Sequence, residues 1–303
     1  MKTSFARVSL LTMFVALGGC GAPERPASPP PTGAESTSGT RNVVRQIDHI
    51  LIASREAEAV FALLSETFRL PIVWPMSDYG GFASGGVALG NVNIEILRST
   101  ASGDATARSR IIGFALEPEP LAGSLAELEA RNVPHGSPSP YNVPGPDGSA
   151  TTLWTTVALP SVSSTDIEVF FCQYEHDVAE ARRELLAELQ SRGGGPLSAL
   201  SVAEVVYGTV DADATRRQWQ ALLDPVQPSS PGLWSVGEGP AIRVVPAPEN
   251  GLLNIVITVA SLSRAREFLA GAGLLGAERP GELSVASPEL EGARITLVEG
   301  DGA

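Results

Sequence analysis

The stretch RQIDHILIASREAEAVFALLSETF, residues 45–68, changes its hydrophobic pattern halfway along. Its first half is a short apolar run, which predicts a buried β-strand. In its second half Val60, Leu64 and Phe68 recur every fourth residue, with Leu63 beside them, which predicts an amphipathic helix. A titratable ring, His49, lies in the middle of the predicted strand. The stretch therefore predicts a strand followed by a helix, with a titratable ring in the strand that needs an explanation.

The same strand-then-helix pattern occurs four times in the chain. In each copy further short strands follow the helix, separated by turn residues. The opening segments of the four copies are QIDHILIAS (46–54), SRIIGFALE (109–117), LSVAEVVYGTV (200–210) and LLNIVITVA (252–260). The repeats predict an α+β chain with four βαβββ units between residues 43 and 299.

The first 42 residues do not show this pattern. Residues 1–19 combine Lys2 and Arg7 with an apolar core and small residues, which predicts a secretory signal peptide too short to span a membrane as a helix. The ending LGGC resembles a bacterial lipobox, which implies cleavage before Cys20 and lipid attached to its thiol. Residues 20–42, rich in Pro, Ser, Thr and Gly, are then an extended tether. We expect an exported protein anchored by lipid at the periplasmic face, on the outer membrane if the cell is Gram-negative.

The charge and the motifs exclude several classes of protein. The formal net charge is −13, so DNA and RNA are not expected partners. Lys2 is the only lysine, and the sequence contains neither a G-x-S-x-G elbow nor a phosphate-binding G-x-x-x-x-G-K loop. If Cys20 carries lipid, Cys172 has no partner for a disulfide. We therefore do not expect a serine hydrolase or an NTPase of common design.

The order of the units resembles the vicinal oxygen chelate superfamily, which includes glyoxalase I, extradiol dioxygenases and bleomycin-resistance proteins. The resemblance is clearest in IDHILIAS, EAEAVFALLSETF and GVALGNVNIEIL of the first unit. It implies that units pair into two half-open barrels, each with a concave cleft. The barrels would span residues 43–177 and 196–299, and residues 178–195 would form a helical connector.

Strand alternation and this resemblance together suggest a site in the first barrel. Alternation predicts that Ile47, His49 and Leu51 share one face of the first strand, and that Glu95 lies on the matching face of the last strand of the unit. The resemblance places metal ligands at His49 and Glu95, with Gln173 of the second unit as a third. Glu95 would also be the catalytic base.

The second unit departs from the family pattern. Ile111 or Gly113 stands where the family has a ligating histidine, and neither can bind a metal. The remaining set of one imidazole, one carboxylate and one amide would hold a divalent ion such as Zn, Mn, Ni or Fe, or would form an ion-free pocket. A buried His49–Glu95 pair without any ligand is the structural alternative.

The predicted clefts differ in their other residues. In the first barrel, the side chains expected to line the substrate cleft are Phe82, Trp154 and Phe171. In the second barrel, the positions equivalent to the site are Glu204, Arg243, Asn254 and Thr296. We interpret Glu204 and Arg243 as an ion pair in a structural half, because an arginine opposes a metal cation.

Three functions remain open at this point. The first two involve a small-molecule ligand, and the third needs no ligand. The first is a metal-assisted lyase or isomerase in the first barrel, where an ion would stabilise an enediolate. The second is a binding protein that sequesters a small molecule without turnover. The third is a scaffold lipoprotein whose barrels are degenerate.

Overall fold

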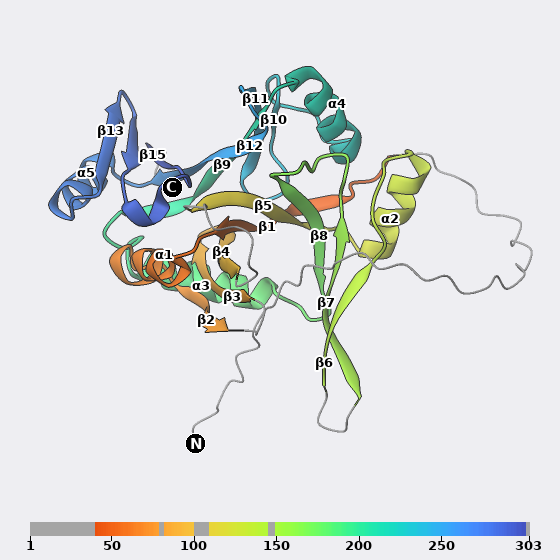
Figure 1. The fold of residues 1–303 in the computed structure, drawn as a ribbon, viewed down its shortest axis with the longest axis horizontal. Helices are drawn as coiled ribbons and strands as arrows, with labels where there is room; N and C mark the ends of the chain where they lie inside the picture. The colour runs from red at the N-terminus through yellow and green to blue at the C-terminus, as the bar shows by residue number, and fades with distance from the viewer. Residues whose placement is uncertain (1–39, 79–81, 100–108, 145–148, 301–303) are drawn as a thin grey trace, which may run out of the picture.

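The computed structural model describes residues 40–78, 82–99, 109–144 and 149–300, and for Phe82, Ser99 and Pro144 it describes the backbone alone. The predicted signal peptide and nearly all of the predicted tether lie outside these residues. The described chain forms two mixed β-sheets with α-helices around them (Figure 1). Among the described helices, none has the length and apolar character needed to cross a membrane.

The first sheet contains the first two units. Its strand order is β2-β3-β4-β1-β5-β8-β7-β6, with β1 and β5 paired antiparallel at the centre. Within each unit the first and last strands are parallel neighbours, as β1 is with β4 and β5 with β8. The elements are β1 (Val44–Ala53), α1 (Ala57–Ala62) with a π-helical turn (Leu63–Thr67), β2 (Ile72–Asp78), β3 (Phe82–Leu89), β4 (Val92–Ser99), β5 (Arg110–Pro118), α2 (Leu121–Ala130), β6 (Ser139–Pro144), β7 (Ala150–Ala158) and β8 (Glu168–Tyr174).

The second sheet repeats this scheme with one strand fewer. Its order is β10-β11-β9-β12-β15-β14-β13, with β9 and β12 antiparallel at the centre. Two strands follow the helix of the third unit, where the other units have three. The elements are β9 (Ala199–Thr209), α4 (Ala212–Leu223), β10 (Leu233–Trp234), β11 (Ala241–Pro246), β12 (Gly251–Val259), α5 (Leu262–Gly271), β13 (Leu275–Arg279), β14 (Glu282–Val285), a 3-10 turn (Pro288–Leu290) and β15 (Ile295–Glu299).

Side-chain caps begin two of the helices in the second half. Asp211 precedes α4 and accepts a hydrogen bond from the backbone N–H of Ala214, at 2.9 Å. Ser261 precedes α5 and accepts one from Arg264, at 3.3 Å. Each cap satisfies a backbone donor that has no partner within its helix. These caps explain why each helix begins directly after its strand.

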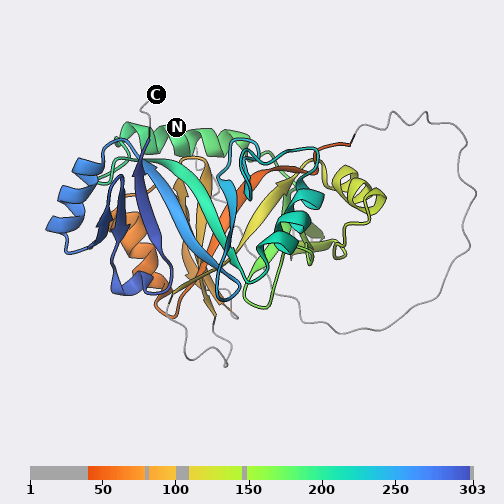
Figure 2. The same cartoon turned by 90° about the horizontal axis from the view of Figure 1, so that it is seen from above.

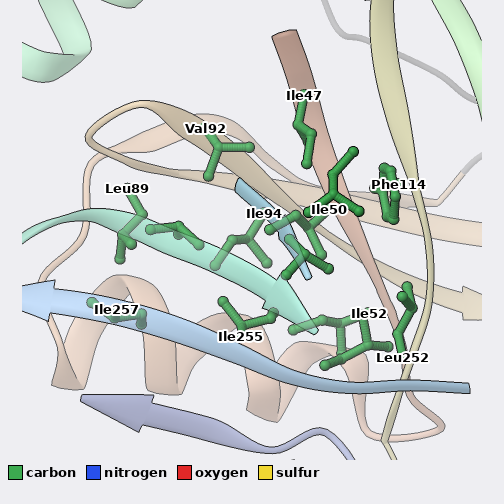
Figure 3. Close-up of a cluster of buried hydrophobic side chains, with 14 of the residues drawn as sticks. Ile47, Ile50, Ile52, Leu89, Val92, Ile94, Phe114, Leu252, Ile255 and Ile257 are labelled. Atoms are coloured by element: carbon green, nitrogen blue, oxygen red, sulfur yellow. The ribbon is translucent and has the colours of Figure 1, made fainter. Parts of the chain in front are cut away.

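The two sheets share one hydrophobic core. Figure 3 shows isoleucines of β1 and β4, such as Ile50 and Ile94, facing Ile255 and Ile257 of β12. Phe114 of β5 stacks on Trp219 of α4 with ring centroids 5.8 Å apart. Buried apolar area stabilises a fold in proportion to its extent, so this continuous core ties both halves together.

Polar contacts also join the sheets at one end. The Asn91 side chain, in the β3–β4 turn, donates to the carbonyls of Val202 and Glu238 and accepts from the N–H of Val202. Gly237, in the β10–β11 turn, has φ +59° and lies so close to Arg45 that a Cβ there would be 2.1 Å from its carbonyl oxygen. Only glycine fits this approach without strain.

A β-bulge in β1 decides which side chains face the site. Ile47 pairs with Leu116 and His49 with Ala115, so Asp48 is an extra residue in β1. The bulge returns Ile47 to the core side with Ile50 and Ile52. The prediction that Ile47 shares a face with His49 is therefore wrong, because alternation does not continue through a bulge.

The opposite face of the first sheet, which we call the inner face, has its own small cluster. It consists of Leu51, Leu97, Ala115, Trp154, Phe170 and Cys172. Helix α3 (Ala179–Ser191) connects the two halves and lies across one end of these strands (Figure 2). The inner face is thus enclosed by the curled sheet and, at one end, by the connector helix.

Candidate functional site

His49 and Glu95 meet on the inner face. Nε2 of His49 is 3.5 Å from Oε2 of Glu95, and both side chains are 2% exposed. The parallel pairing of β1 and β4 brings them together, since Glu95 lies opposite Leu51, two residues beyond His49. The contact is too poor for a hydrogen bond, and Nε2 has no hydrogen-bond partner among the described residues. A buried nitrogen without a hydrogen-bond partner is rare in folded proteins and calls for a structural or functional explanation.

Asp48 fixes the ring of His49 and was not among the predicted site residues. Its Oδ2 lies 2.6 Å from Nδ1 of His49 and accepts a hydrogen bond from the hydroxyl of Tyr174 at 2.9 Å. Its other oxygen accepts from Arg182 of α3. The sequence did carry a signal: two polar residues in a row interrupt an apolar strand, which is what a bulge permits.

The pKa values of this pair move in opposite directions. Burial alone raises the pKa of Asp48, but the hydrogen bond and charge of His49 and the charge of Arg182 outweigh it and hold that pKa below its ordinary value. Burial alone lowers the pKa of His49, but the hydrogen bond and charge of Asp48 and the charge of Glu95 raise it above its ordinary value. The cluster therefore favours an ionised Asp48 beside a protonated ring.

Glu95 is held from the other side by a short chain of polar groups. The hydroxyl of Ser84 donates to Oε1 of Glu95 at 2.6 Å. The indole N–H of Trp74 donates to that hydroxyl at 3.1 Å. Ser84 and Trp74 are themselves buried. These contacts fix the orientation of the carboxylate on the inner face.

The rest of the inner face is apolar, and part of it is aromatic. The ring of Phe170 lies edge-on to that of His49, with centroids 5.9 Å apart, and Trp154 stacks on Tyr141 at 4.3 Å. Trp154, which is 3% exposed and does not line the cavity described below, lies on the inner face. Phe171 does not, because it points into the shared core and is 0% exposed. For Phe82 the side chain lies outside what the structure describes.

Gln173 does not join His49 and Glu95. It lies on the same side of β8 as Phe171, and its side-chain oxygen accepts a hydrogen bond from the N–H of Leu121, at 2.6 Å. Gln173 therefore caps the start of α2. The residue beside it, Cys172, is the one on the inner face. Burial and the charge of Asp48 raise the pKa of its thiol well above the ordinary value, so Cys172 is a neutral thiol.

These residues do not fit a resident divalent ion. Zinc sites use three or more protein ligands, and the described residues include no group of three or more His, Cys, Asp or Glu side chains placed to hold an ion. His49 and Glu95 supply two donors, while the second unit adds mainly apolar and aromatic side chains and the neutral thiol of Cys172 to this face. The prediction that Gln173 is a third metal ligand beside His49 and Glu95 is wrong, because its side chain points to the start of α2.

A cavity of about 970 Å³ lies beside this cluster, at the end of the first half-barrel that α3 covers. Its walls are the ends of β1, β3, β4, β5 and β8, together with α3 and turns of the second sheet. Asn93 and Tyr174 of the inner face line it, as does Arg182. His49 and Glu95 do not, so they are separated from the cavity by this layer.

The corresponding residues of the second sheet form closed pairs. The guanidinium of Arg243 donates to both oxygens of Glu204. The side chains of Asn254 and Thr296 hydrogen-bond to each other at 3.0 and 3.2 Å. The predicted Glu204–Arg243 ion pair is confirmed.

Comparison with known proteins identifies the fold. No family model and no curated protein sequence matches the chain. A hypothetical protein from Staphylococcus aureus is 12% identical with a TM-score of 0.57, over 84% of this chain and 99% of its own. A mutant 4-hydroxymandelate synthase from Streptomyces coelicolor is 11% identical with a TM-score of 0.57, over 86% and 94%. An Mn(II)-bound glyoxalase from Novosphingobium aromaticivorans is 14% identical with a TM-score of 0.52, over 86% and 83%.

These structures share an architecture and little sequence. Extradiol-type 2,3-dioxygenases, such as one from Pseudomonas sp. KL28, match in the same way, with 13% identity and a TM-score of 0.52 over 86% of this chain and 94% of that one. The agreement covers both sheets, as the sequence resemblance predicted. The chain therefore has the fold of the vicinal oxygen chelate superfamily.

Proposed function

We propose that this protein binds a small molecule in the cavity between α3 and the end of the first half-barrel. The observation that carries the proposal is the cavity itself, whose volume of about 970 Å³ lies at the upper end of the roughly 300–1,000 Å³ typical of ligand pockets. Proteins of the same fold include a glyoxalase and dioxygenases. Their names support a small-molecule role for this protein.

The walls of the cavity combine apolar side chains with many polar and charged ones, which suits a molecule that carries both kinds of group. Leu185 and Leu186 of α3 and Leu200 of β9 supply the apolar side. The amide of Asn93 and the hydroxyl of Tyr174 lie on the side nearest the polar cluster. A few fixed polar groups among apolar ones orient a ligand and give it specificity.

A second candidate is acid–base chemistry by Glu95 and His49. It is favoured by one observation, the buried Nε2 of His49 without a hydrogen-bond partner beside the Glu95 carboxylate. Glu95 would accept a carbon-bound proton, and the His49 ring would donate to the oxygen on which negative charge develops. Because both groups are 2% exposed, a substrate reaches them only if the layer above them moves.

The cavity is tested with the full chain carrying Cys20→Ser, so that it is exported without lipid. We expect aromatic acids, amides or amines from a small panel to raise the melting temperature, with about 2.7 kcal/mol gained at a hundredfold excess over Kd. Leu186→Trp, which fills the cavity, should abolish the shift. Ala187→Trp, on the exposed side of the same helix, should preserve it. Equal shifts in both variants would place binding elsewhere.

Metal analysis of the same protein separates binding from metal-dependent catalysis. We expect no stoichiometric divalent ion by mass spectrometry, because the inner face supplies only two donors. A stoichiometric metal that disappears in His49→Ala would overturn the proposal and support the enzyme.

Lipid anchoring through Cys20 completes the proposed function. It rests on the sequence alone, since residues 1–39 lie outside the described chain. Two or more acyl chains are enough to hold a soluble domain on a membrane. We expect the wild-type protein to fractionate with membranes and the Cys20→Ser variant to be released. Release of both to the same extent would contradict the anchor.

A further inference from the structure

The connector helix α3 reaches into the first half-barrel through one side chain, Arg182. Its guanidinium donates to a carboxylate oxygen of Asp48 and, at 2.6 Å, to Oε2 of Glu117. The side chains of these two acceptors are 1% and 12% exposed. Apart from Leu189, the residues of α3 are half-buried or exposed. Arg182 thus makes the most deeply inserted polar contact of the helix.

Other side chains hold the two carboxylates in place independently of α3. Oδ2 of Asp48 accepts from the hydroxyl of Tyr174 at 2.9 Å. Glu117 accepts from Nη1 of Arg45 and from Nε2 of Gln46, both at 2.9 Å. The pair is therefore arranged in advance to receive the planar, forked donor of a guanidinium.

We infer that Asp48 and Glu117 form a binding site for a guanidinium or amidinium ion, that Arg182 is its built-in ligand, and that this contact latches α3 over the inner face. Near residue 182, α3 is held by the hydrogen bonds of one guanidinium to two carboxylates and not by burial of a large apolar surface. A small cation of the same shape occupies the site when Arg182 is removed. The inference does not depend on a ligand in the neighbouring cavity.

Cys172 reports whether the inner face is open. Its thiol is buried on that face with 3% exposure. The chain has two cysteines, so Cys172 is the only thiol when Cys20 is replaced by serine. The charge of Arg182 lowers the pKa of this thiol. Removing Arg182 would by electrostatics alone slow thiol modification, so faster modification means that the face has opened.

The test measures the rate at which N-ethylmaleimide modifies Cys172 in the full chain carrying Cys20→Ser. We expect Arg182→Ala to increase this rate about 10- to 100-fold, because charge-assisted hydrogen bonds are lost. Millimolar guanidinium or methylguanidinium chloride should restore slow modification. Sodium chloride and tetramethylammonium chloride at the same ionic strength should not. Arg183→Ala changes the next residue of the helix, which is exposed, and should leave the rate unchanged.

Three results would overturn the inference. The first is an Arg182→Ala rate equal to that of the wild type. The second is an increased rate that guanidinium restores no better than sodium, which would make Arg182 an ordinary stabilising ion pair. If the Arg182→Ala variant does not fold, the test uses the Arg182→Gln variant and asks whether guanidinium allows Arg182→Ala to refold. Failure of Arg182→Ala to refold in the presence of guanidinium is the third result. Although Glu117 and Arg182 also line the cavity, the thiol assay contains no cavity ligand, so this failure and a failure of the proposed function are distinguishable.

Discussion

Replacement of Asp48 by alanine is expected to lower the free energy of unfolding by about 3–5 kcal/mol, the range for removing one partner of a buried ion pair. Asp48 is the common acceptor of the inner face, where it joins the ring of His49, the hydroxyl of Tyr174 and the guanidinium of Arg182. Its loss leaves the buried ring of His49 and the half-buried hydroxyl of Tyr174 without this acceptor, and it removes one of the two carboxylates that bind Arg182. No apolar gain compensates, because the alanine side chain is too small to fill the space.

Urea unfolding followed by circular dichroism measures this effect. Asp48→Asn is the informative partner variant, because its side-chain oxygen still accepts hydrogen bonds while the charge is gone, so we expect a smaller loss. Asp166→Ala is the control, since Asp166 makes an exposed pair with Arg110 at 3.4 Å, and such pairs contribute little. If Asp48→Ala is no more destabilising than Asp166→Ala, Asp48 does not organise the inner face.

Replacement of Phe114 by alanine should cost about 3–5 kcal/mol, the range for emptying a buried aromatic site. Phe114 is 0% exposed and stacks on Trp219, which in turn contacts Tyr207 of β9 edge-on. The substitution therefore opens a cavity between the two sheets. Because both sheets share this core, we expect both to lose stability together.

The measurement compares two signals during denaturant unfolding, far-ultraviolet circular dichroism and tryptophan fluorescence. We expect coincident transitions in the wild type and, at lower denaturant, in Phe114→Ala. Phe170→Ala, on the inner face, is the matched control because it removes the same side chain away from the interface between the sheets. Two separate transitions, only one of them shifted by Phe114→Ala, would mean that the halves fold independently.

Much of the architecture was predictable because it depends on local patterns. The apolar strands and the helical period of Val60, Leu64 and Phe68 indicate elements without reference to anything distant. Repetition of that pattern indicates four related units. The pairing of β1 with β4 then follows from the family resemblance, and it places His49 beside Glu95.

The errors in the site have two local causes. The bulge at Asp48 shifts the alternation of β1, so Ile47 turns to the core and Asp48 joins His49. On β8 both faces are apolar, with Val169 and Phe171 on one side and Phe170 and Cys172 on the other. Alternation shows which residues share a face, but without a polar contrast it does not show which face is inward. Gln173 was therefore assigned to the wrong side.

The sequence by itself determined the repeated units, their order and the faces of the strands that carry one imidazole and one carboxylate, because these follow from hydrophobic period. That the two strands are neighbours came from the family resemblance. The tertiary structure alone decided that the two sheets share a core and that Arg182 of α3 reaches Asp48 and Glu117. These contacts join residues far apart in the chain, such as Asp48 and Arg182, 134 positions apart. No local period relates such residues, since packing and charge complementarity bring them together only after both elements exist.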